Sequence, residues 1–292
     1  MTATGSLRAM LFVPGTAEEK FAKIPRLAAT SFILDLEDSV PPSEKERARH
    51  LVTQLIESIG ARYVLYVRVN ATSSPHLADD LTAVVRPGLA GIVVPKVERP
   101  EDLVTVNRLI DERTAEVEMD AGDLDVMATI ETAAGLHSVY DIAAVGGHLN
   151  RLSFGSADFA LDVGLDWPDD DGVFDTILIA KSQLVLASRV AGLEQPHDGA
   201  YSRYRDLDGL AVEARQSRRL GFSGKHVIHP SQIPVVKQIF EPSPKQIGRA
   251  ERIISAFEMA ERSGRAAVGV DGELVDAAIV ARARRLLQES ED

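Results

Sequence analysis

Two acidic residues, each placed after a short apolar run, are the strongest candidates for metal binding in this sequence. Glu131 comes directly after VMATI, and Asp158 stands in LSFGSADFA. Carboxylates at the ends of neighbouring buried strands suit Mg²⁺, which prefers oxygen ligands and keeps several waters that a substrate can displace. Each carboxylate could instead cap the helix after its strand. The pair, together with the other polar residues at strand ends, favours the metal site.

Three more carboxylates end the segment ILDLEDSV. In a continuous strand Asp35 and Glu37 share one face and Asp38 points to the other, so the three cannot all bind one ion. We predict that Glu37 and Asp38 hydrogen-bond to metal-bound water. The alternative is that Asp38 or Ser39 caps the helix expected to begin near Ser43.

Basic side chains occupy three other strand ends. Arg68 in YVRVN could meet a carboxylate or a developing enolate in bidentate fashion, or form a structural ion pair with the ILDLED segment. Lys96 in VVPKVE could pair with Glu98 or Glu131. His229 in VIHPSQ could act as a base, but a histidine before proline at a strand end is as often structural.

These residues need a scaffold that brings several strand ends together. Short runs rich in β-branched and apolar residues recur along the chain and indicate buried strands. Segments with helical spacing lie between them, such as 43–59 and 100–113. The predicted strands are 8–13, 31–36, 63–69, 91–94, 125–130, 151–154 and 225–228, with a weaker eighth strand at 190–193.

The positions of the polar residues favour a closed barrel over an open sheet. The candidate residues, Asn70 among them, lie at or just beyond the C-terminal ends of successive strands, where a barrel collects its catalytic groups. An open dinucleotide-binding sheet should show a glycine-rich turn after its first strand, but FVPGTAEEK has one glycine. We therefore predict an α/β fold, a (β/α)8 TIM barrel over residues 1–235.

The character of the chain changes after the eighth expected barrel strand. Residues 236–292 contain helical stretches around a small segment with two glycines, 266–274. This tail is too short for an independent core, so we expect it to dock on the barrel or on a neighbouring subunit as a helical lid.

Composition limits the possible functions. The 292 residues include no cysteine, which excludes disulfides, thiolate metal sites and a cysteine nucleophile. A formal net charge of −12 argues against binding to nucleic acid or an anionic membrane. No apolar run approaches the ~20 residues that span a bilayer, and the first residues lack a signal-peptide pattern, so we expect a cytoplasmic protein.

Taken in order and spacing, the motifs resemble a known family over essentially the whole chain. LFVPG, LDLEDSV, VRVN, VVPKVE, IETAAG, FGSADFALDVG, LGFSGKHVIHPSQI and DGELVDAAIVARA are similar to the citrate lyase β-subunit-like acyl-CoA lyases. That group includes malyl-CoA and citramalyl-CoA lyases and is related to the HpcH/HpaI aldolases. The resemblance implies Mg²⁺ as cofactor, with Glu131 and Asp158 as its ligands and Arg68 as a substrate-binding residue.

The resemblance also implies a coenzyme A site. It involves the segment after LFVPG and the GK and IHP parts of the last barrel motif, together with the alanine beside Asp158. Ala17 stands where relatives often have arginine, so the phosphate clamp is weaker here or Arg8 and Lys20 compensate. The implied residues are Phe12, Lys23, Ala157, Lys225, Ile228 and His229.

In the family's coenzyme A lyases, a C-terminal lid carries an aspartate that completes the active site of the next subunit. The matching residue here is Asp276 in GELVDAA, which by position alone would be the N-cap of the last helix or an acid in its first turn. The resemblance therefore implies a homotrimer or hexamer with shared active sites.

The expected reaction is cleavage or formation of a 3-hydroxyacyl-CoA, giving an acyl-CoA and a 2-oxoacid. A thioesterase or synthase of the same family, a coenzyme A-independent 2-oxoacid aldolase and a non-catalytic subunit of a larger complex remain alternatives. The sequence does not identify the 2-oxoacid, whose small distinguishing group we expect to meet loop residues near 166–175.

Overall fold

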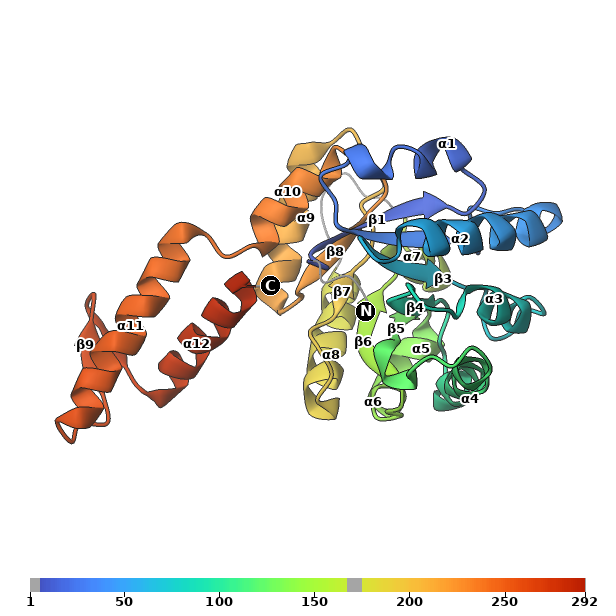
Figure 1. Cartoon of the computed structure of the whole chain (residues 1–292). Helices are drawn as coiled ribbons and strands as arrows, with labels where there is room; N and C mark the ends of the chain where they lie inside the picture. Colours follow the sequence, from blue (N-terminus) through green and yellow to red (C-terminus); the bar gives the residue numbers. More distant parts are fainter. Residues whose placement is uncertain (1–5, 167–174, 292) are drawn as a thin grey trace. The chain divides into compact units, whose positions relative to one another are not determined.

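A closed barrel of parallel strands forms the first part of the molecule (Figure 1). The computed structural model describes residues 6–166 and 175–291. The strands pair in chain order, and β1 closes the barrel against β8, as the sequence predicted. They are β1 (Ala9–Pro14), β2 (Ser31–Asp35), β3 (Val64–Arg68), β4 (Gly91–Val94), β5 (Asp125–Ile130), β6 (Leu149–Phe154), β7 (His197–Asp198) and β8 (Gly224–Val227).

Helices connect successive strands and cover the outside of the barrel (Figure 1). In α2 (Lys45–Ile59), Ala48, Val52 and Ile56 recur at helical spacing and are buried. The others are α1 (Glu18–Phe21), α3 (Leu77–Val84), α4 (Pro100–Glu116), α5 (Ala133–His137), α6 (Val139–Ala143), α7 (Ser156–Asp162), α8 (Asp175–Ala191), α9 (Leu207–Leu220) and α10 (Gln232–Phe240), with 3-10 turns at Ile24–Arg26, Pro42–Glu44 and Ala121–Asp123.

Side chains from several strands fill the barrel interior. This apolar cluster consists of Met10, Ile33, Val64, Tyr66, Val93 and Met127. The Tyr66 hydroxyl donates to Asp125 Oδ2 at 2.9 Å, so its polar end is satisfied in the interior. The interior is therefore a packed core, and the polar residues gather at the carboxyl ends of the strands.

The seventh strand corrects one expectation. The weak strand expected at 190–193 is wrong, because α8 continues to Ala191 and the strand is His197–Asp198. Asp198 is completely buried, and it pairs with Lys181 of α8 and Lys225 of β8. Two polar residues give no apolar run to recognise, and their burial depends on partners far away in the chain.

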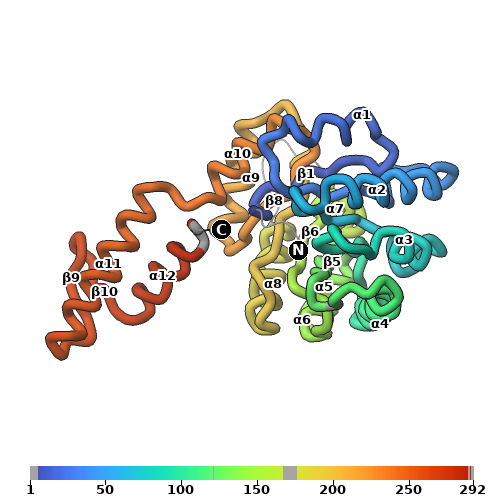
Figure 2. The backbone as a smooth tube through the Cα atoms, in the orientation of Figure 1, coloured from blue at the N-terminus to red at the C-terminus, as the bar shows by residue number. Residues whose placement is uncertain are grey.

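The chain divides into two compact units, Met1–Val236 and Lys237–Asp292, one residue from the boundary expected at 235. The second unit consists of α11 (Pro244–Arg262), an antiparallel pair of β9 (Val268–Val270) and β10 (Glu273–Val275), and α12 (Ala277–Glu291) (Figure 2). The expectation that this tail has no core is wrong. Its buried side chains pack together, namely Ala250, Ile253, Phe257, Val275, Val280 and Ala283.

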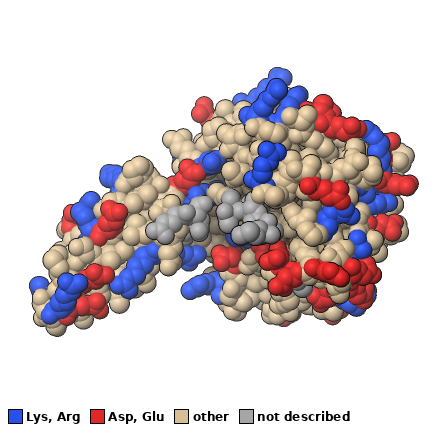
Figure 3. Space-filling model, viewed as in Figure 1, with Lys and Arg blue, Asp and Glu red and all other residues tan. Residues whose placement is uncertain are grey.

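Charged side chains of both signs share the surface. On the face shown in Figure 3, Lys and Arg are interspersed with Asp and Glu among the described residues. None of the helices in the described chain has the length and apolar character needed to cross a membrane.

Candidate active site

An Arg68–Asp35 ion pair stands at the carboxyl ends of β2 and β3. The two residues are neighbours in the sheet register, and Arg68 donates from Nε to Asp35 Oδ1 at 2.7 Å and from Nη2 to Oδ2 at 2.8 Å. Burial raises the pKa of Asp35, but the hydrogen bonds and charge of Arg68 outweigh it, so the pKa lies below its usual range. The structural ion pair with the ILDLED segment, one of the two interpretations of Arg68, is therefore present.

The third guanidinium nitrogen of Arg68 faces the acidic loop that follows β2. Arg68 Nη1 lies 3.1 Å from Glu37 Oε2 and 3.6 Å from Asp38 Oδ2. The Arg68 guanidinium also lies over the half-buried ring of Phe12, with Cζ 4.9 Å from the ring centre. Arg68 is thus fixed by Asp35 on one side, and its Nη1 faces the acidic loop on the other side.

Asp38 does not point away from Glu37, which corrects the face assignment made for a continuous strand. The strand ends at Asp35, whose carboxylate accepts from the backbone N–H of Glu37 at 2.9 Å and of Ser39 at 3.1 Å. This turn brings Glu37 and Asp38 together in front of Lys96 and Arg68. The residues that the pattern placed on opposite faces therefore belong to one acidic loop.

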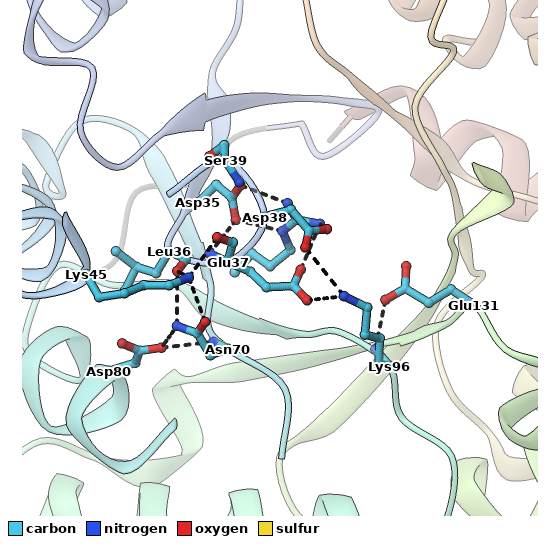
Figure 4. A network of polar contacts seen from close by, with 11 residues as sticks. Asp35, Leu36, Glu37, Asp38, Ser39, Lys45, Asn70, Asp80, Lys96 and Glu131 are labelled. Carbon is cyan, nitrogen blue, oxygen red and sulfur yellow. Dashed lines mark hydrogen bonds and ion pairs between the residues drawn. The ribbon is translucent and has the colours of Figure 1, made fainter. Parts of the chain in front are cut away.

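Lys96 links this loop to Glu131. Its Nζ donates to Glu37 Oε1 at 2.7 Å and lies 3.5 Å from Asp38 Oδ1, while its backbone N–H donates to Glu131 Oε1 at 2.8 Å (Figure 4). Burial lowers the pKa of Lys96, but the hydrogen bond and charge of Glu37 outweigh it and raise the pKa. Lys96 is therefore a cation at the centre of the acidic group.

Glu131 is a buried carboxylate with other negative charges near it. It follows β5 and is 3% exposed. Burial, then the negative charges of Asp158 and Glu37, raise its pKa to about 8. A side chain at Gly155 would collide with the Glu131 carboxylate, so glycine is needed where β6 passes into α7. Such crowding of negative charge fits a cation site.

Neither candidate metal ligand caps a helix, which removes the alternative considered for both. The N-cap of α5 is Thr132, whose Oγ1 accepts from Gly135 N at 3.1 Å. Asp158 lies within the first turn of α7, half-buried, and Gly155 precedes that helix. The described residues contain no group of three or more His, Asp or Glu arranged for a metal, so water and substrate would complete the coordination of Mg²⁺.

A buried network beneath the acidic loop includes two residues that sequence analysis missed, Lys45 and Asp80. Lys45 Nζ donates to the carbonyls of Leu36 and Glu37 at 2.6 and 2.8 Å and to Asn70 Oδ1 at 2.7 Å. Asn70 Nδ2 donates in turn to Asp80 (Figure 4). One signal was present in the sequence: Lys45 shares its helix face with buried apolar residues, an unusual place for lysine.

The residues implied for coenzyme A binding fall into two groups. The residues of the first group are accessible to solvent: Phe12 is half-buried, and Lys23, Ala157, Ile228 and His229 are exposed. His229 Nδ1 lies 2.8 Å from Ser231 Oγ, and its ring packs against Tyr204. Ala17, at the position often occupied by arginine, is buried at the start of α1.

Lys225 forms the second group, and its expected role as a phosphate ligand is wrong in this structure. Its side chain is completely buried, with Nζ bonded to Asp198 Oδ2 at 2.6 Å and to Glu213 of α9. Burial lowers the pKa of Lys225, but the charges of Asp198 and Glu213 outweigh it and raise the pKa. The Lys225 ammonium is therefore paired with carboxylates of β7 and α9 and does not face a ligand.

Asp276 lies in the second unit and forms the N-cap of α12. Its Oδ1 accepts from the backbone N–H groups of Ala278 and Ile279, both at 3.0 Å, and the residue is exposed. Of the two positions suggested by the sequence alone, the N-cap is therefore confirmed, and a catalytic role of Asp276 remains a prediction. Most of the expected substrate loop at 166–175 falls outside the described residues.

A closed parallel barrel with buried carboxylates and an arginine at its strand ends defines a class of enzymes that work at that end of the barrel. Within this class, the chain belongs to the HpcH/HpaI aldolase/citrate lyase family, whose model matches residues 8–230.

Relatives that match nearly the full length of this chain include a protein named as a thioesterase and one named as a lyase. The chain is 35% identical to a (3S)-malyl-CoA thioesterase of Cereibacter sphaeroides, covering 97% of this chain and 94% of that protein. It is 32% identical to an L-malyl-CoA/beta-methylmalyl-CoA lyase of the same species, with the same coverage. Among solved structures it is similar to CitE of Mycobacterium tuberculosis in complex with magnesium, acetoacetate and coenzyme A, at 30% identity, a TM-score of 0.79 and full coverage of both chains.

Proposed function

We propose that this protein is a Mg²⁺-dependent carbon–carbon lyase that cleaves or forms a 3-hydroxyacyl-CoA of the malyl-CoA or citramalyl-CoA type. The products of cleavage are an acyl-CoA and a 2-oxoacid. The observation that carries the proposal is the placement of Glu131, which is 3% exposed at the end of β5 and accepts from the backbone N–H of Lys96 at 2.8 Å. Burial and the charges of Asp158 and Glu37 raise its pKa to about 8. Relatives named as malyl-CoA enzymes and a solved relative that contains magnesium and coenzyme A support it.

Glu131 and Asp158 would hold the metal. When bound, Mg²⁺ supplies a Lewis acid that polarises the oxygens of the substrate and lowers the pKa of its hydroxyl group. Glu37 and Asp38 would accept hydrogen bonds from waters at the site, since both lie in the acidic loop beside Lys96.

Arg68 would stabilise the charge that develops on the thioester. In cleavage the hydroxyl would give its proton to a water held by Glu37 and Asp38 and become the carbonyl of the 2-oxoacid. The electron pair of the broken carbon–carbon bond would move to the thioester oxygen. The bidentate pair with Asp35 holds Arg68 in place, so the guanidinium requires little reorganisation. Such preorganised stabilisation is commonly worth roughly 3–4 kcal/mol.

Asp276 would protonate the carbon of the acyl-CoA or, in condensation, remove its proton. Because it is an exposed N-cap in the second unit, we propose that it acts in a neighbouring subunit of a homotrimer or hexamer in the cytoplasm. Phe12, Lys23, Ala157, Ile228 and His229 would bind coenzyme A, because they are at least partly accessible.

A direct assay tests the reaction. Purified protein with Mg²⁺ is incubated with acetyl-CoA or propionyl-CoA and a panel of 2-oxoacids, and new thioesters are identified by mass. We expect one 3-hydroxyacyl-CoA to form. Glu131→Gln and Asp158→Asn should abolish its formation while the protein stays folded, because both changes are nearly isosteric.

Thioesterase activity is the second candidate, favoured by the name of the 35% identical relative. Incubation of the protein with malyl-CoA separates the two activities, because a thioesterase releases free coenzyme A and malate, whereas a lyase releases acetyl-CoA and glyoxylate. Turnover of a 2-oxoacid without coenzyme A would instead indicate an aldolase. No turnover by the pure chain would contradict all three and favour a non-catalytic subunit.

A further inference from the structure

Lys96 has a backbone conformation that side chains rarely adopt. Its φ is 52°, in the left-handed region, and the only other non-glycine residues with positive φ in the described ranges are Glu118 and Asp271. Such strain persists only where surrounding contacts over-determine the conformation, and it gathers at functional sites. Glu118 and Asp271 lie outside the acidic group, so Lys96 is the strained residue of the candidate site.

The left-handed turn lets one residue contact two parts of the site at once. The backbone N–H of Lys96 reaches Glu131 Oε1 at 2.8 Å, and its Nζ reaches Glu37 Oε1 at 2.7 Å (Figure 4). Immediately after it, the N–H of Val97 donates to the carbonyl of Thr129 on β5 at 3.2 Å. The β4 end is thereby fastened to β5 while the Lys96 side chain extends towards the loop after β2.

Glycine would adopt this conformation without strain and would still donate the N–H to Glu131. The advantage of lysine must therefore lie in its side chain. The ammonium is the group between Glu37 and Asp38, and it is only partly buried, with 37% of the side chain exposed. It tethers the acidic loop to the residue that holds Glu131.

We infer that Lys96 is a positioning residue that sets the spacing between the metal-binding carboxylate Glu131 and the acidic loop at Glu37. This inference rests on the proposed function, since it gives Glu131 the role of a Mg²⁺ ligand. Removing the tether leaves the Glu131 hydrogen bond possible but frees the loop on the other side of the site. Groups that orient metal ligands in this way typically contribute about 10–100-fold to metal affinity or activity.

The test compares Lys96→Gly with Glu118→Gly. Both changes relieve a left-handed non-glycine conformation, but Glu118 is an exposed residue after α4, outside the site. For each purified variant, Mg²⁺ binding is measured by titration calorimetry without substrate, the melting temperature by calorimetry, and kcat and KM by the thioester assay.

We expect Lys96→Gly to weaken Mg²⁺ binding by about tenfold or more and to lower kcat, with little change in the KM for acyl-CoA. The melting temperature of Lys96→Gly should fall little, although its Mg²⁺ affinity falls about tenfold or more. Glu118→Gly should bind Mg²⁺ as the wild type does. Lys96→Arg should restore most of the Mg²⁺ affinity, because a long cation can still reach Glu37, and Lys96→Met should not.

Wild-type Mg²⁺ affinity in both Lys96→Gly and Lys96→Met would overturn the inference. If Lys96→Gly does not fold, Lys96→Met decides, since it keeps the length of the side chain. Failure of the proposed reaction gives a different result. A wild-type protein that binds Mg²⁺ but makes no thioester contradicts the lyase, while the Mg²⁺ affinities of the variants still decide the role of Lys96.

Discussion

Glu131 shows how a single carboxylate can be prepared for a cation. Burial and two neighbouring negative charges favour its neutral form, while the N–H of Lys96 partly opposes them. A divalent ion would reverse this balance by replacing like-charge repulsion with attraction. The residue is thus unfavourable for the stability of the metal-free fold and useful for binding, a combination common at functional sites.

The raised pKa of Glu131 predicts an unusual dependence of stability on pH. Without metal, the folded protein keeps the Glu131 proton up to about pH 8, whereas the unfolded chain loses it near the ordinary glutamate pKa of 4.5. Between these values the native state binds more protons, so this group lowers the free energy of unfolding as pH rises. Glu131→Gln should flatten the dependence in chelator-treated protein, measured by denaturant unfolding across that window.

Metal binding should depend on pH in the complementary way. Because Mg²⁺ requires the carboxylate, its affinity should rise towards about pH 8 and its binding should release a proton. Calorimetry in two buffers of different ionisation enthalpy detects that proton. Affinity that does not change over this range would contradict a raised Glu131 pKa.

At the scale of elements, the two-residue strand β7 is held in place mainly by buried ion pairs, because it is too short for many backbone hydrogen bonds. Asp198 connects this two-residue strand to α8 through Lys181, to β8 through Lys225, and to α9 through Ser217. Burial raises the pKa of Asp198, but the charges of Lys181 and Lys225 outweigh it and lower the pKa. The two lysines and the carboxylates of Asp198 and Glu213 balance one another in a buried layer.

Asp198→Asn should therefore be strongly destabilising. It removes the charged partner of two buried ammonium groups, of which Lys225 keeps its contact with Glu213, and breaking a buried pair in this way costs about 3–5 kcal/mol. Glu112→Gln is the control, because it removes an exposed pair with Arg108 and should cost less than about 1 kcal/mol. Urea unfolding of both variants measures the difference, and equal midpoints would contradict the account of β7.

At the scale of the whole molecule, the two units raise the question of where Asp276 acts. The second unit has its own small core around Phe257. Asp276 at its helix start is exposed and within the sequence that resembles the family's lid. We propose that it completes the site of a neighbouring subunit.

Mixing two inactive proteins tests this arrangement. Glu131→Gln and Asp276→Ala should each be inactive, and unfolding and reassembling them together should restore part of the activity. The reason is that some interfaces then combine an intact metal site with an intact lid. Activity is measured by the thioester assay, and native mass spectrometry shows whether mixed oligomers form. Mixed oligomers without activity would mean that Asp276 acts within its own subunit or not at all.

Local pattern was sufficient for the barrel strands and helices other than β7 and for the carboxylates at the strand ends. A buried strand, its following acid and the next helix are neighbours in the chain, so periodicity and residue type reveal them. The barrel, and Glu131 beside the Asp158 segment, could be predicted on this basis. The resemblance favoured the substrate role of Arg68, which residue type and position had left open beside a structural ion pair, and it added Asp276 as a lid residue. Both roles remain predictions.

Only the tertiary structure decided which charged groups meet. Arg68 and Asp35 pair across two strands, Lys96 joins Glu37 to Glu131 through a left-handed turn, and Lys225 turns outward to Asp198 and Glu213. A lysine in a strand motif looks the same in sequence whether it faces a ligand or the back of a helix. Its role depends on the direction of the side chain and on partners distant in the chain, which are brought close only when the barrel closes.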